Sequence, residues 1–524
     1  MQEKPIRFGT GGWRAVIGSD FIESNIRRTA EGICALMCEE GRTDKPVIIG
    51  YDHRFLSETA ARWIAEVLAA HGVPVMFLRR SAPTPLIMHT VLRQGLHYGI
   101  EITASHNPSC YNGVKLIVEE GRDAPVETTA RLEQLIAAVR PEDVRDMPFE
   151  DAESAGLILW QKNPFNAFID DILSVMDLPA IREHGARVLF DPMFGSGTYP
   201  LLVILCTARC TVDMIHNTRD AHFGGNLPAP TVKGLGELRN RVTTGGYELG
   251  IAFDGDGDRL GIIDRTGRYL SANEILVMLY WYLHEKKGWR GPVVRNLATT
   301  HMLDVMAASF GEVCYEVPVG FKYISSKIDE VDAVLGGESS GGLTVRGHIH
   351  GKDSVYASSL FVEMLFVTGK SAGKLLSELQ EKYGTTDTIK IGMIMLPSNE
   401  SWHQRDLGAL DVLAEEKYSN IEVVNEWSWD STGAVTPSAT ISTWLAADAN
   451  KELRAIWCAW DGAAFEGLVL TGESRPEIMY TGCDGGEECW NYMINYPESF
   501  IMSAGESIYN MPRSLVQYSQ SYNE

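Results

Sequence analysis

The stretch 46-PVIIGYDHRFLSETAARWIAEVLAAHGVPVMFL-78 contains an apolar run, a helix-like segment and a second apolar run. The first run is typical of a buried strand, and Ser57 is expected to cap the helix that follows it. Gly72 ends the helix before the second strand. This order predicts a βαβ unit, and therefore a parallel or mixed sheet covered by helices. The core face of the helix is expected to carry Trp63, Ile64, Val67 and Leu68.

The same alternation of strand and helix recurs further along the chain. Its 524 residues exceed what one hydrophobic core organises, so three or four domains are expected. We predict the α/β class, with three consecutive mixed-sheet domains followed by an atypical α/β segment. Further strand-like runs lie at 187–197, 247–264 and 291–300. The expected domains are 1–155, 156–268, 269–385 and 386–524.

Composition and charge narrow the class of protein. A net charge of −23 argues against a nucleic-acid-binding surface. The longest apolar run, Ile275–Leu283, is too short to span a membrane, and no signal peptide is visible at the N-terminus. Nine cysteines without a CxxC pair indicate reduced thiols, so a cytoplasmic location is expected. Residues 386–524 differ in kind, because 7 Lys and Arg stand against 21 Asp and Glu, giving −14.

The hexapeptide 254-DGDGDR-259 places three carboxylates at alternate positions between two apolar segments. The intervening glycines let the backbone turn tightly, so the carboxylates can converge on one hard cation. A single Asp-Gly pair would indicate a hairpin turn, but three carboxylates in succession favour a cation site. An EF-hand is excluded because Arg259 and Arg265 stand where that loop needs Gly and Glu. We therefore predict Mg²⁺ bound by Asp254, Asp256 and Asp258.

Ser105 lies in the loop TASHNP, directly after a strand-like run, and Lys115 follows ten residues later. A lone loop serine usually has no chemical role. The G-x-S-x-G elbow of acyl hydrolases is absent, which disfavours a Ser-His-Asp triad. A serine that accepts a phosphoryl group beside Mg²⁺ accounts for this loop and for DGDGDR together. The metal would neutralise phosphate oxygens that three aspartates alone would repel.

Two further glycine-rich stretches have functional and ordinary interpretations. The stretch 336-GGESSGG-342 is either a flexible linker or a loop that presents acceptors to sugar hydroxyls. The stretch 7-RFGTGGWRAVIG-18 lacks the spacing and the lysine of a nucleotide P-loop. It is either an N-terminal turn or an anion cradle beside Arg14.

Together these motifs, in this order, resemble the α-D-phosphohexomutase family, which includes phosphoglucomutases and phosphomannomutases. The resemblance covers the chain up to about residue 385. FGTGGWR is similar to the family's N-terminal loop, TASHNP with NGVK to its phosphoserine loop, DGDGDR to its metal loop and GGESSGG to its sugar-binding loop. The segments 318-PVGFKYI-324 and 350-HGKDS-354 also stand where the family contacts phosphate and sugar.

The resemblance implies a mechanism and a set of site residues. Phosphorylated Ser105 would give its phosphoryl group to a hexose phosphate, and the bisphosphate intermediate would turn over and return its other phosphate to Ser105. Mg²⁺ and a hexose 1,6-bisphosphate activator are implied, with a small-molecule hexose phosphate as partner and neither nucleic acid nor membrane. The implied catalytic residues are Ser105, Lys115, His106, Arg14 and Arg259. The implied substrate-binding residues are Glu338, Ser340, Lys322, His350 and Lys352. The implied metal ligands are Ser105, Asp254, Asp256 and Asp258.

After residue 385 the sequence no longer resembles that of the family. Members usually end in a fourth domain with a phosphate-gripping loop like R-x-S-G-T-E-P, and the nearest text here, 471-TGESRPE-477, has the letters in another order. We therefore expect weaker retention and reorientation of the substrate, with chemistry that is impaired rather than absent.

The tail resembles instead one lobe of a type I sugar-binding protein of bacterial import systems. That resemblance implies a ligand cleft near Asp461 and Asp484, with Trp460 able to stack on a sugar, whereas in an ordinary α/β domain these aspartates would only cap helices. The chain is then a natural fusion or a hybrid of two coding sequences. A non-catalytic protein that binds sugars or sugar phosphates is the alternative to the enzyme, and a phosphatase-like leak to water is a third possibility.

Overall fold

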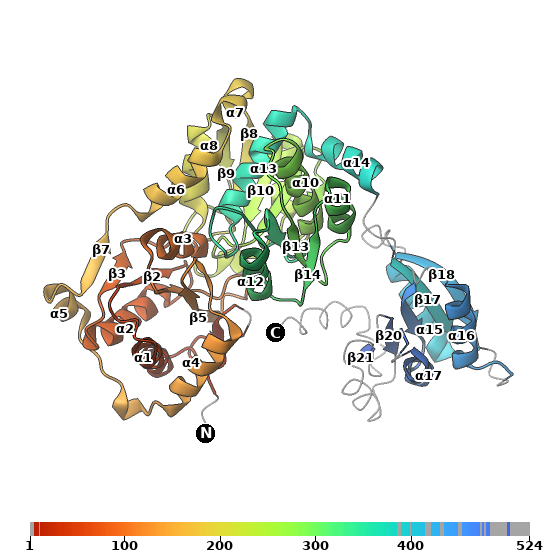
Figure 1. The fold of residues 1–524 in the computed structure, drawn as a ribbon, viewed down its shortest axis with the longest axis horizontal. Coiled ribbons are helices and arrows are strands. Elements are labelled where there is room, and N and C mark those ends of the chain that lie inside the picture. Colours follow the sequence, from red (N-terminus) through yellow and green to blue (C-terminus); the bar gives the residue numbers. More distant parts are fainter. Residues whose placement is uncertain are drawn as a thin grey trace. The chain divides into compact units, whose positions relative to one another are not determined.

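The computed structural model of the chain describes residues 5–9, 11–384, 389–398, 400–413, 421–429, 434–448, 453–471, 474–475, 478–482 and 500–503. These form two compact units, divided between Gly384 and Thr385. The first unit contains three sheets and the second contains one (Figure 1). Among the described residues, no helix combines the length and apolar composition needed to cross a bilayer.

The first sheet contains seven strands in the order β1-β5-β4-β2-β3-β7, with β6 paired to β5. Strands β4, β2, β3 and β7 are mutually parallel, and β5 runs antiparallel to both β4 and β1. The sheet is therefore mixed, as predicted. Its strands are β1 (Trp13–Val16), β2 (Val47–Tyr51), β3 (Val75–Leu78), β4 (Tyr98–Ile102), β5 (Tyr111–Val118), β6 (Arg122–Asp123) and β7 (Ile158–Gln161). Its helices are α1 (Glu23–Glu39), α2 (Ser57–Ala70), α3 (Thr84–Gln94), α4 (Val126–Ala138), η1 (Pro141–Asp143) and α5 (Phe149–Ser154).

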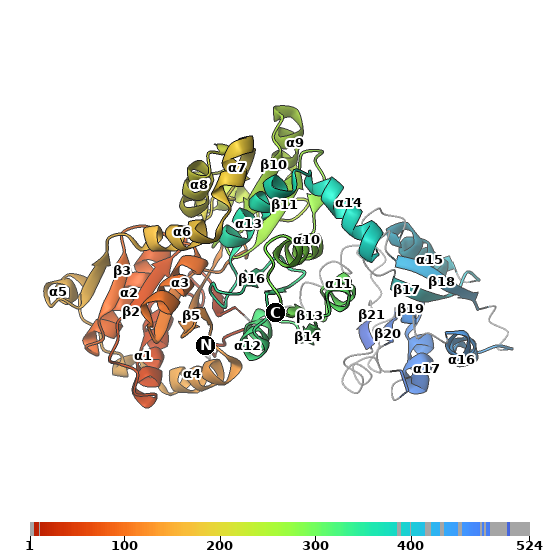
Figure 2. The ribbon, with the colours of Figure 1, turned by 45° about the horizontal axis from the view of Figure 1, so that its top comes forward.

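Alternating side chains of β2 point into two different cores. Val47, Ile49 and Tyr51 pack with residues of α1, α2 and α4, whereas Ile48 packs with residues of α3. Both faces of the sheet are thus covered by helices (Figure 2). β7 pairs with β3, so this sheet extends to Gln161, past the expected domain limit at residue 155.

The βαβ unit of residues 46–78 forms as predicted, but its helix begins differently. Ile64, Val67 and Leu68 are buried in the core as expected, with Trp63 packed at its margin. The prediction that Ser57 is the N-cap was wrong. Ser57 is the first helical residue, and the N-cap position belongs to Leu56, whose φ is 65°. The buried carboxylate of Asp52 accepts the Ser57 hydroxyl at 2.7 Å, so this hydroxyl is not used to cap the helix.

The second sheet contains five strands in the order β12-β11-β10-β8-β9. β8, β9 and β10 are parallel, and β11 returns antiparallel to β10 as a hairpin. The segment NPFNAFIDDILSVMD contains α6. The strands are β8 (Arg187–Asp191), β9 (Thr211–Met214), β10 (Leu249–Phe253), β11 (Leu260–Asp264) and β12 (Tyr269–Leu270). The helices are α6 (Pro164–Val175), α7 (Leu178–His184), α8 (Thr198–Thr207), η2 (Phe223–Gly225) and α9 (Gly236–Gly245).

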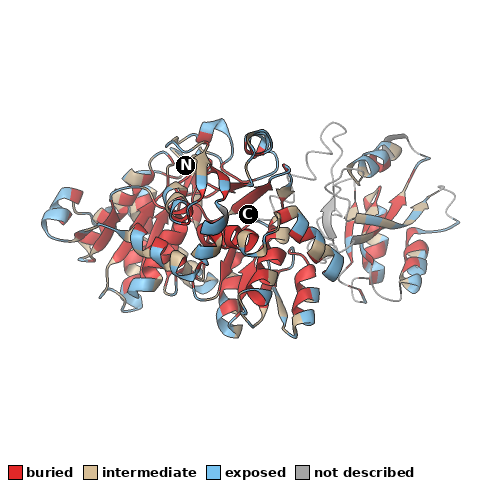
Figure 3. Cartoon of the chain, turned by 90° about the horizontal axis from the view of Figure 1, so that it is seen from above, coloured by how far each residue is buried: buried red, intermediate tan, exposed pale blue. Residues whose placement is uncertain are grey.

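The third sheet contains four strands in the order β14-β13-β15-β16, with β16 antiparallel to β15. One apolar core runs from α3 through α6, α10 and α13, so the three sheets are joined by packed side chains. Figure 3 shows this interior as buried. The strands are β13 (Val293–Asn296), β14 (Cys314–Val317), β15 (Leu335–Gly337) and β16 (Leu343–Val345). The helices are α10 (Ala272–Glu285), α11 (Met302–Phe310), α12 (Phe321–Val331), α13 (Ser354–Thr368) and α14 (Ala372–Tyr383).

The C-terminal unit is an α/β fold of its own, with an all-parallel sheet in the order β18-β17-β19-β20-β21. α16 and α17 pack together on one face, and α15 lies on the other (Figure 2). The strands are β17 (Ile389–Met395), β18 (Ile421–Ser428), β19 (Leu453–Cys458), β20 (Met479–Gly482) and β21 (Phe500–Ser503). The helices are α15 (Glu400–Leu413), α16 (Pro437–Ala447) and α17 (Asp461–Thr471).

Candidate active site

Ser105 lies in the loop after β4, at the edge of the first sheet. Its φ is 49°, in the left-handed region that non-glycine residues rarely adopt. The residue is fully buried, and its Oγ donates a 2.7 Å hydrogen bond to Oδ2 of Asp254. Nδ1 of His106 lies 3.3 Å from the same Oγ. A hydroxyl from the first sheet thus meets a carboxylate from the second.

The three aspartates occupy the turn of the β10–β11 hairpin, and one oxygen of each lies within 4.8 Å of the others. Asp254, Asp256 and Asp258 are all buried. Oδ1 of Asp256 and Oδ1 of Asp258 have no hydrogen-bond partner. Buried carboxylate oxygens without partners are costly, and a divalent cation with oxygen ligands would satisfy them. The residues therefore fit a Mg²⁺ site.

The three carboxylates lie in different electrostatic surroundings. Burial, together with the charges of Asp256 and Asp258, raises the pKa of Asp254 well above its usual range. Burial also acts to raise the pKa of Asp258, but Lys115, Lys352 and other cations outweigh it and hold that pKa well below its usual range. The raised pKa of Asp254 reflects burial first and then repulsion by Asp256 and Asp258, and a bound cation would counter both.

Lys115 lies on β5, where its register partner on β4 is Glu101. Its Nζ donates to Oδ2 of Asp256 at 2.7 Å and to Oδ2 of Asp258 at 2.9 Å. Burial acts to lower the pKa of this ammonium, but the two aspartates outweigh burial and hold the pKa above its ordinary value. Lys115 is therefore a fixed positive charge within the cluster.

Arg14, His106 and Arg259 contribute to the region where the loop that carries Ser105 and the aspartate loop come together. β1 pairs with β5 so that Arg14 lies opposite Gly113, and its Nη1 donates to the Asn107 side chain at 2.6 Å. Burial and the charges of Arg259, Arg14 and Lys352 lower the pKa of His106 far below its ordinary value, so its ring is neutral. The backbone N–H of Arg259 donates to Asp254 Oδ1 at 3.0 Å, and its buried Nε has no hydrogen-bond partner.

The metal loop (254–259) and the loop that carries Ser105 (105–111, the serine loop) are in contact at Gly255. A Cβ added at Gly255 would lie 2.6 Å from the backbone oxygen of Ser105. Only glycine permits this approach without moving one of the two loops.

The third sheet contributes the loop predicted to bind sugar. Glu338 is buried, and its Oε1 accepts from the backbone N–H of Gly320 at 3.1 Å, while its Oε2 accepts from the Ser340 hydroxyl at 3.0 Å. The backbone oxygen of Gly341 accepts from the N–H of Leu260 at 3.2 Å, which joins this loop to the end of the metal loop. The GGESSGG stretch is therefore a structured turn between β15 and β16, and a flexible linker is excluded.

The remaining predicted substrate residues lie in three different settings. Lys352 joins the metal loop, because its Nζ lies 2.8 Å from Oδ2 of Asp258. His350 lies where the first and third sheets meet, with its ring Nδ1 against Asp329. Lys322 lies on the first turn of α12, two residues after Gly320, with its Nζ over the Tyr323 ring.

Several polar residues of the site were missed by sequence reasoning. Thr84, at the start of α3, donates its hydroxyl to Oδ2 of Asp256 at 2.7 Å. Asn296, at the end of β13, donates to Oε1 of Glu338 at 3.3 Å. Arg54 donates to the backbone of the serine loop. Each stands at a strand end or a helix start, which was the available signal, but such positions are too common to single these residues out.

In the C-terminal unit, Trp460 stacks on Trp429, with ring centroids 5.2 Å apart and an interplanar angle of 25°. Asp461 is buried and begins α17. Asp484, the other residue of the predicted ligand cleft, lies outside the described residues.

Comparison with known proteins identifies the first unit. Three family models, described as Phosphoglucomutase/phosphomannomutase, alpha/beta/alpha domains I, II and III, match residues 5–143, 166–267 and 271–383. A phosphoglucomutase/phosphomannomutase of Thermococcus kodakarensis is 27% identical over 72% of this chain and 80% of its own length. A phosphoglucosamine/phosphogalactosamine mutase of Sulfurisphaera tokodaii is 26% identical over 72% of this chain and 81% of its own length.

A crystal structure of a protein assigned as a phosphomannomutase, from Thermus thermophilus, superimposes with a TM-score of 0.68. It is 30% identical and covers 73% of this chain and 85% of its own length. The chain therefore belongs to the phosphoglucomutase/phosphomannomutase family. It is an enzyme of the phosphohexomutase type, an isomerase that acts by intramolecular phosphotransfer.

Proposed function

We propose that this protein interconverts hexose 1-phosphate and hexose 6-phosphate through a phosphoserine at Ser105 and a hexose 1,6-bisphosphate intermediate. In the first half, the Ser105 Oγ–P bond breaks as a bond forms between phosphorus and the free sugar hydroxyl, which loses its proton. In the second half, the other sugar O–P bond breaks, the released sugar oxygen takes the proton back, and the Oγ–P bond reforms. The observation that carries this proposal is the 2.7 Å hydrogen bond from Ser105 Oγ to Asp254 inside a cluster of buried charges.

Mg²⁺ would be held by Asp254, Asp256, Asp258 and the phosphate on Ser105. When bound, it would neutralise charge on the phosphoryl oxygens and draw them toward the hairpin turn. The unpartnered oxygens of Asp256 and Asp258 support this assignment.

The chain's own cations complete the charge balance. Arg14 binds Asn107 of the loop that carries Ser105, the Arg259 N–H binds Asp254, and Lys115 binds Asp256 and Asp258, so positive charge is already in place beside the aspartates. Such preorganised charge lowers the barrier of phosphoryl transfer without reorganising solvent. Lys115 is also the candidate acid/base, but it can exchange a proton with substrate only when its bonds to Asp256 and Asp258 are released.

Glu338 and Ser340 would bind the sugar hydroxyls, with Lys322, His350 and Lys352 as further contacts. The Glu338 carboxylate is held by Gly320 and Asn296, so it presents a fixed acceptor. A fixed acceptor suits a sugar that must be bound in two orientations.

The decisive experiment is a coupled assay of glucose 1-phosphate conversion with a catalytic amount of glucose 1,6-bisphosphate. We expect activity that disappears with EDTA and returns with Mg²⁺, together with a phosphorylated Ser105 detected by mass spectrometry. Release of inorganic phosphate at the rate of substrate loss would indicate the leak to water instead. Absence of phosphoserine and turnover, with sugar binding lost on Asp461→Ala, would favour the binding protein.

Substrate preference and retention need separate measurements. The relatives named above act on glucose, mannose and amino-sugar phosphates by their names, so mannose 1-phosphate and glucosamine 1-phosphate belong in the same assay. Residues 386–524 contain no R-x-S-G-T-E-P loop, and we propose that this segment does not retain the substrate as the family's fourth domain does. A raised KM and early release of the bisphosphate intermediate are expected, and a KM typical of the family would contradict this.

A further inference from the structure

Arg54, in the connection between β2 and α2, is together with Arg295 among the largest fully buried side chains of the described residues. Its guanidinium donates to four backbone oxygens of the serine loop. Nη2 donates to Ser105 at 2.5 Å and to Asn107 at 2.8 Å, and Nη1 donates to Pro108 at 2.8 Å and to Tyr111 at 3.0 Å. The Arg54 side chain therefore holds the backbone of that loop at four points.

The fifth donor of the guanidinium is used as well. Nε of Arg54 donates to Oδ2 of Asp52 at 3.2 Å, and that same oxygen accepts the Thr103 hydroxyl at 2.7 Å. Oγ1 of Thr103 in turn accepts the backbone N–H of Ser105 at 2.8 Å. Asp52 and Arg54 therefore hold Ser105 from both sides, through its N–H and its carbonyl.

This arrangement explains how Ser105 keeps its unusual backbone conformation. A φ of 49° is unfavourable for serine and persists only where the surroundings enforce it. A lysine could not replace Arg54, because an ammonium has three donors and no planar fork, whereas five acceptors converge here.

We propose that Arg54 is a positioning residue for phosphoryl transfer, setting the backbone of the 105–111 loop so that Ser105 Oγ faces the metal-binding aspartates. The proposal rests on the proposed function for its catalytic consequence, but the geometry of the loop can be measured independently. The Arg54 guanidinium donates to Asp52 and to four loop carbonyls, so Arg54 acts through the backbone that it binds.

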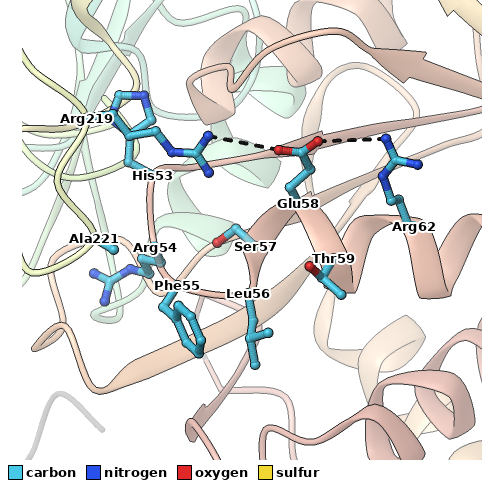
Figure 4. Close-up of a pocket in the computed structure, with 10 residues that line it drawn as sticks. All are labelled: His53, Arg54, Phe55, Leu56, Ser57, Glu58, Thr59, Arg62, Arg219 and Ala221. Atoms are coloured by element: carbon cyan, nitrogen blue, oxygen red, sulfur yellow. Dashed lines mark ion pairs between the residues drawn. The ribbon is translucent and has the colours of Figure 1, made fainter.

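A cavity of about 240 Å³ provides a way to test this chemically. It is lined by Arg54, Arg62 and Arg219 among others, and Glu58 lies between the last two arginines (Figure 4). Truncating Arg54 would extend this cavity to the loop carbonyls. An added guanidinium ion, which carries the same planar donors, could then enter from this side.

The experiment compares Arg54→Ala, Arg54→Lys and the control Arg62→Ala in the full chain. Arg62 lines the same cavity but pairs with Glu58 and packs on the Phe149 ring, away from the loop. We expect kcat of Arg54→Ala to fall about 100-fold with KM little changed, because misplacing a nucleophile by about 1 Å costs that much. Arg54→Lys should fall nearly as far. Arg62→Ala should match wild type.

Two readouts distinguish positioning from a general loss of stability. Amide hydrogen exchange of residues 103–113 should accelerate in both Arg54 variants and not in Arg62→Ala. Guanidinium below denaturing concentration should restore kcat in Arg54→Ala by about tenfold and should not restore it in Arg62→Ala or wild type. If Arg54→Ala does not fold, Arg54→Lys carries the exchange and kcat measurements.

Unchanged loop exchange in a folded Arg54 variant, or a kcat within about threefold of wild type, would overturn the proposal. If wild-type protein shows no mutase turnover, the proposed function fails. Loop exchange and phosphorylation of Ser105 by glucose 1,6-bisphosphate then decide the role of Arg54 on their own.

Discussion

Buried charges are used differently in the two units of this chain. In residues 5–384, Ser105 and Lys115 from the first sheet meet aspartates from the second and Lys352 from the third. In the C-terminal unit, Asp406 accepts the backbone N–H of Leu396 at 3.1 Å.

The buried charges of the two units are therefore expected to have different roles. In the first unit, three carboxylates repel one another although Lys115 and Lys352 pair with them, and one of these carboxylates binds a reactive hydroxyl. Charges tied to nearby backbone satisfy strand ends and helix starts. The first arrangement is expected to control turnover and the second to control stability.

The largest effect is expected from Ser105→Ala. Removing the nucleophile should lower kcat by at least about 10⁴-fold, because every turnover passes through the serine oxygen. Thermal unfolding should change little. Ser109→Ala, in the same loop, is the matched control and should retain activity. Both are measured in the coupled assay, with phosphoserine followed by mass spectrometry. An active Ser105→Ala variant would show that the reaction does not take place at this cluster.

Gly255→Ala should have the next largest effect. Its new Cβ would lie 2.6 Å from the Ser105 oxygen and push the metal loop from the serine loop. We expect kcat to fall about 10- to 100-fold, because the reacting groups would be misplaced by a fraction of an ångström. Gly236→Ala, at an open position on α9, is the control. Equal kcat in the two variants would show that this contact does not set the geometry.

Asp406→Ala tests the other side of the comparison. It removes the acceptor of the Leu396 N–H, so the free energy of unfolding of the C-terminal unit should fall by about 1–3 kcal/mol while kcat stays unchanged. Tryptophan fluorescence reports this unfolding, because 7 of the 12 tryptophans lie in residues 386–524. Asp406→Asn keeps an acceptor and should lose less. A fall in kcat without loss of stability would give this charge a chemical role.

The smallest effect is expected from Glu101→Gln. Both Glu101 carboxylate oxygens are buried without hydrogen-bond partners, and burial raises its pKa well above the usual range. Because the folded-state pKa is the higher one, the wild type loses stability as pH rises above about 4.3, the value for an unfolded glutamate. Glutamine does not titrate, so the variant should equal wild type near pH 4 and exceed it at pH 8. Thermal unfolding at both values checks the sign.

Local patterns account for the parts of the fold that were predicted. Alternating apolar runs gave the βαβ unit of residues 46–78, and the spacing of Asp254, Asp256 and Asp258 predicted their convergence. The failures have long-range causes. Ser57 does not cap its helix because its hydroxyl donates to the Asp52 carboxylate. β7 belongs to the first sheet because it pairs with β3, a strand that is distant in the sequence.

By itself, the sequence determined the α/β class, the family and the residues with chemical capacity, because glycine spacing and apolar periodicity act over a few residues. Only the tertiary structure decided that Lys352 joins Asp258 and that Arg54 holds the serine loop. Those contacts join residues about 50 to 100 positions apart in the sequence. They form only in the folded chain, where a buried charged group is stable only if it is paired.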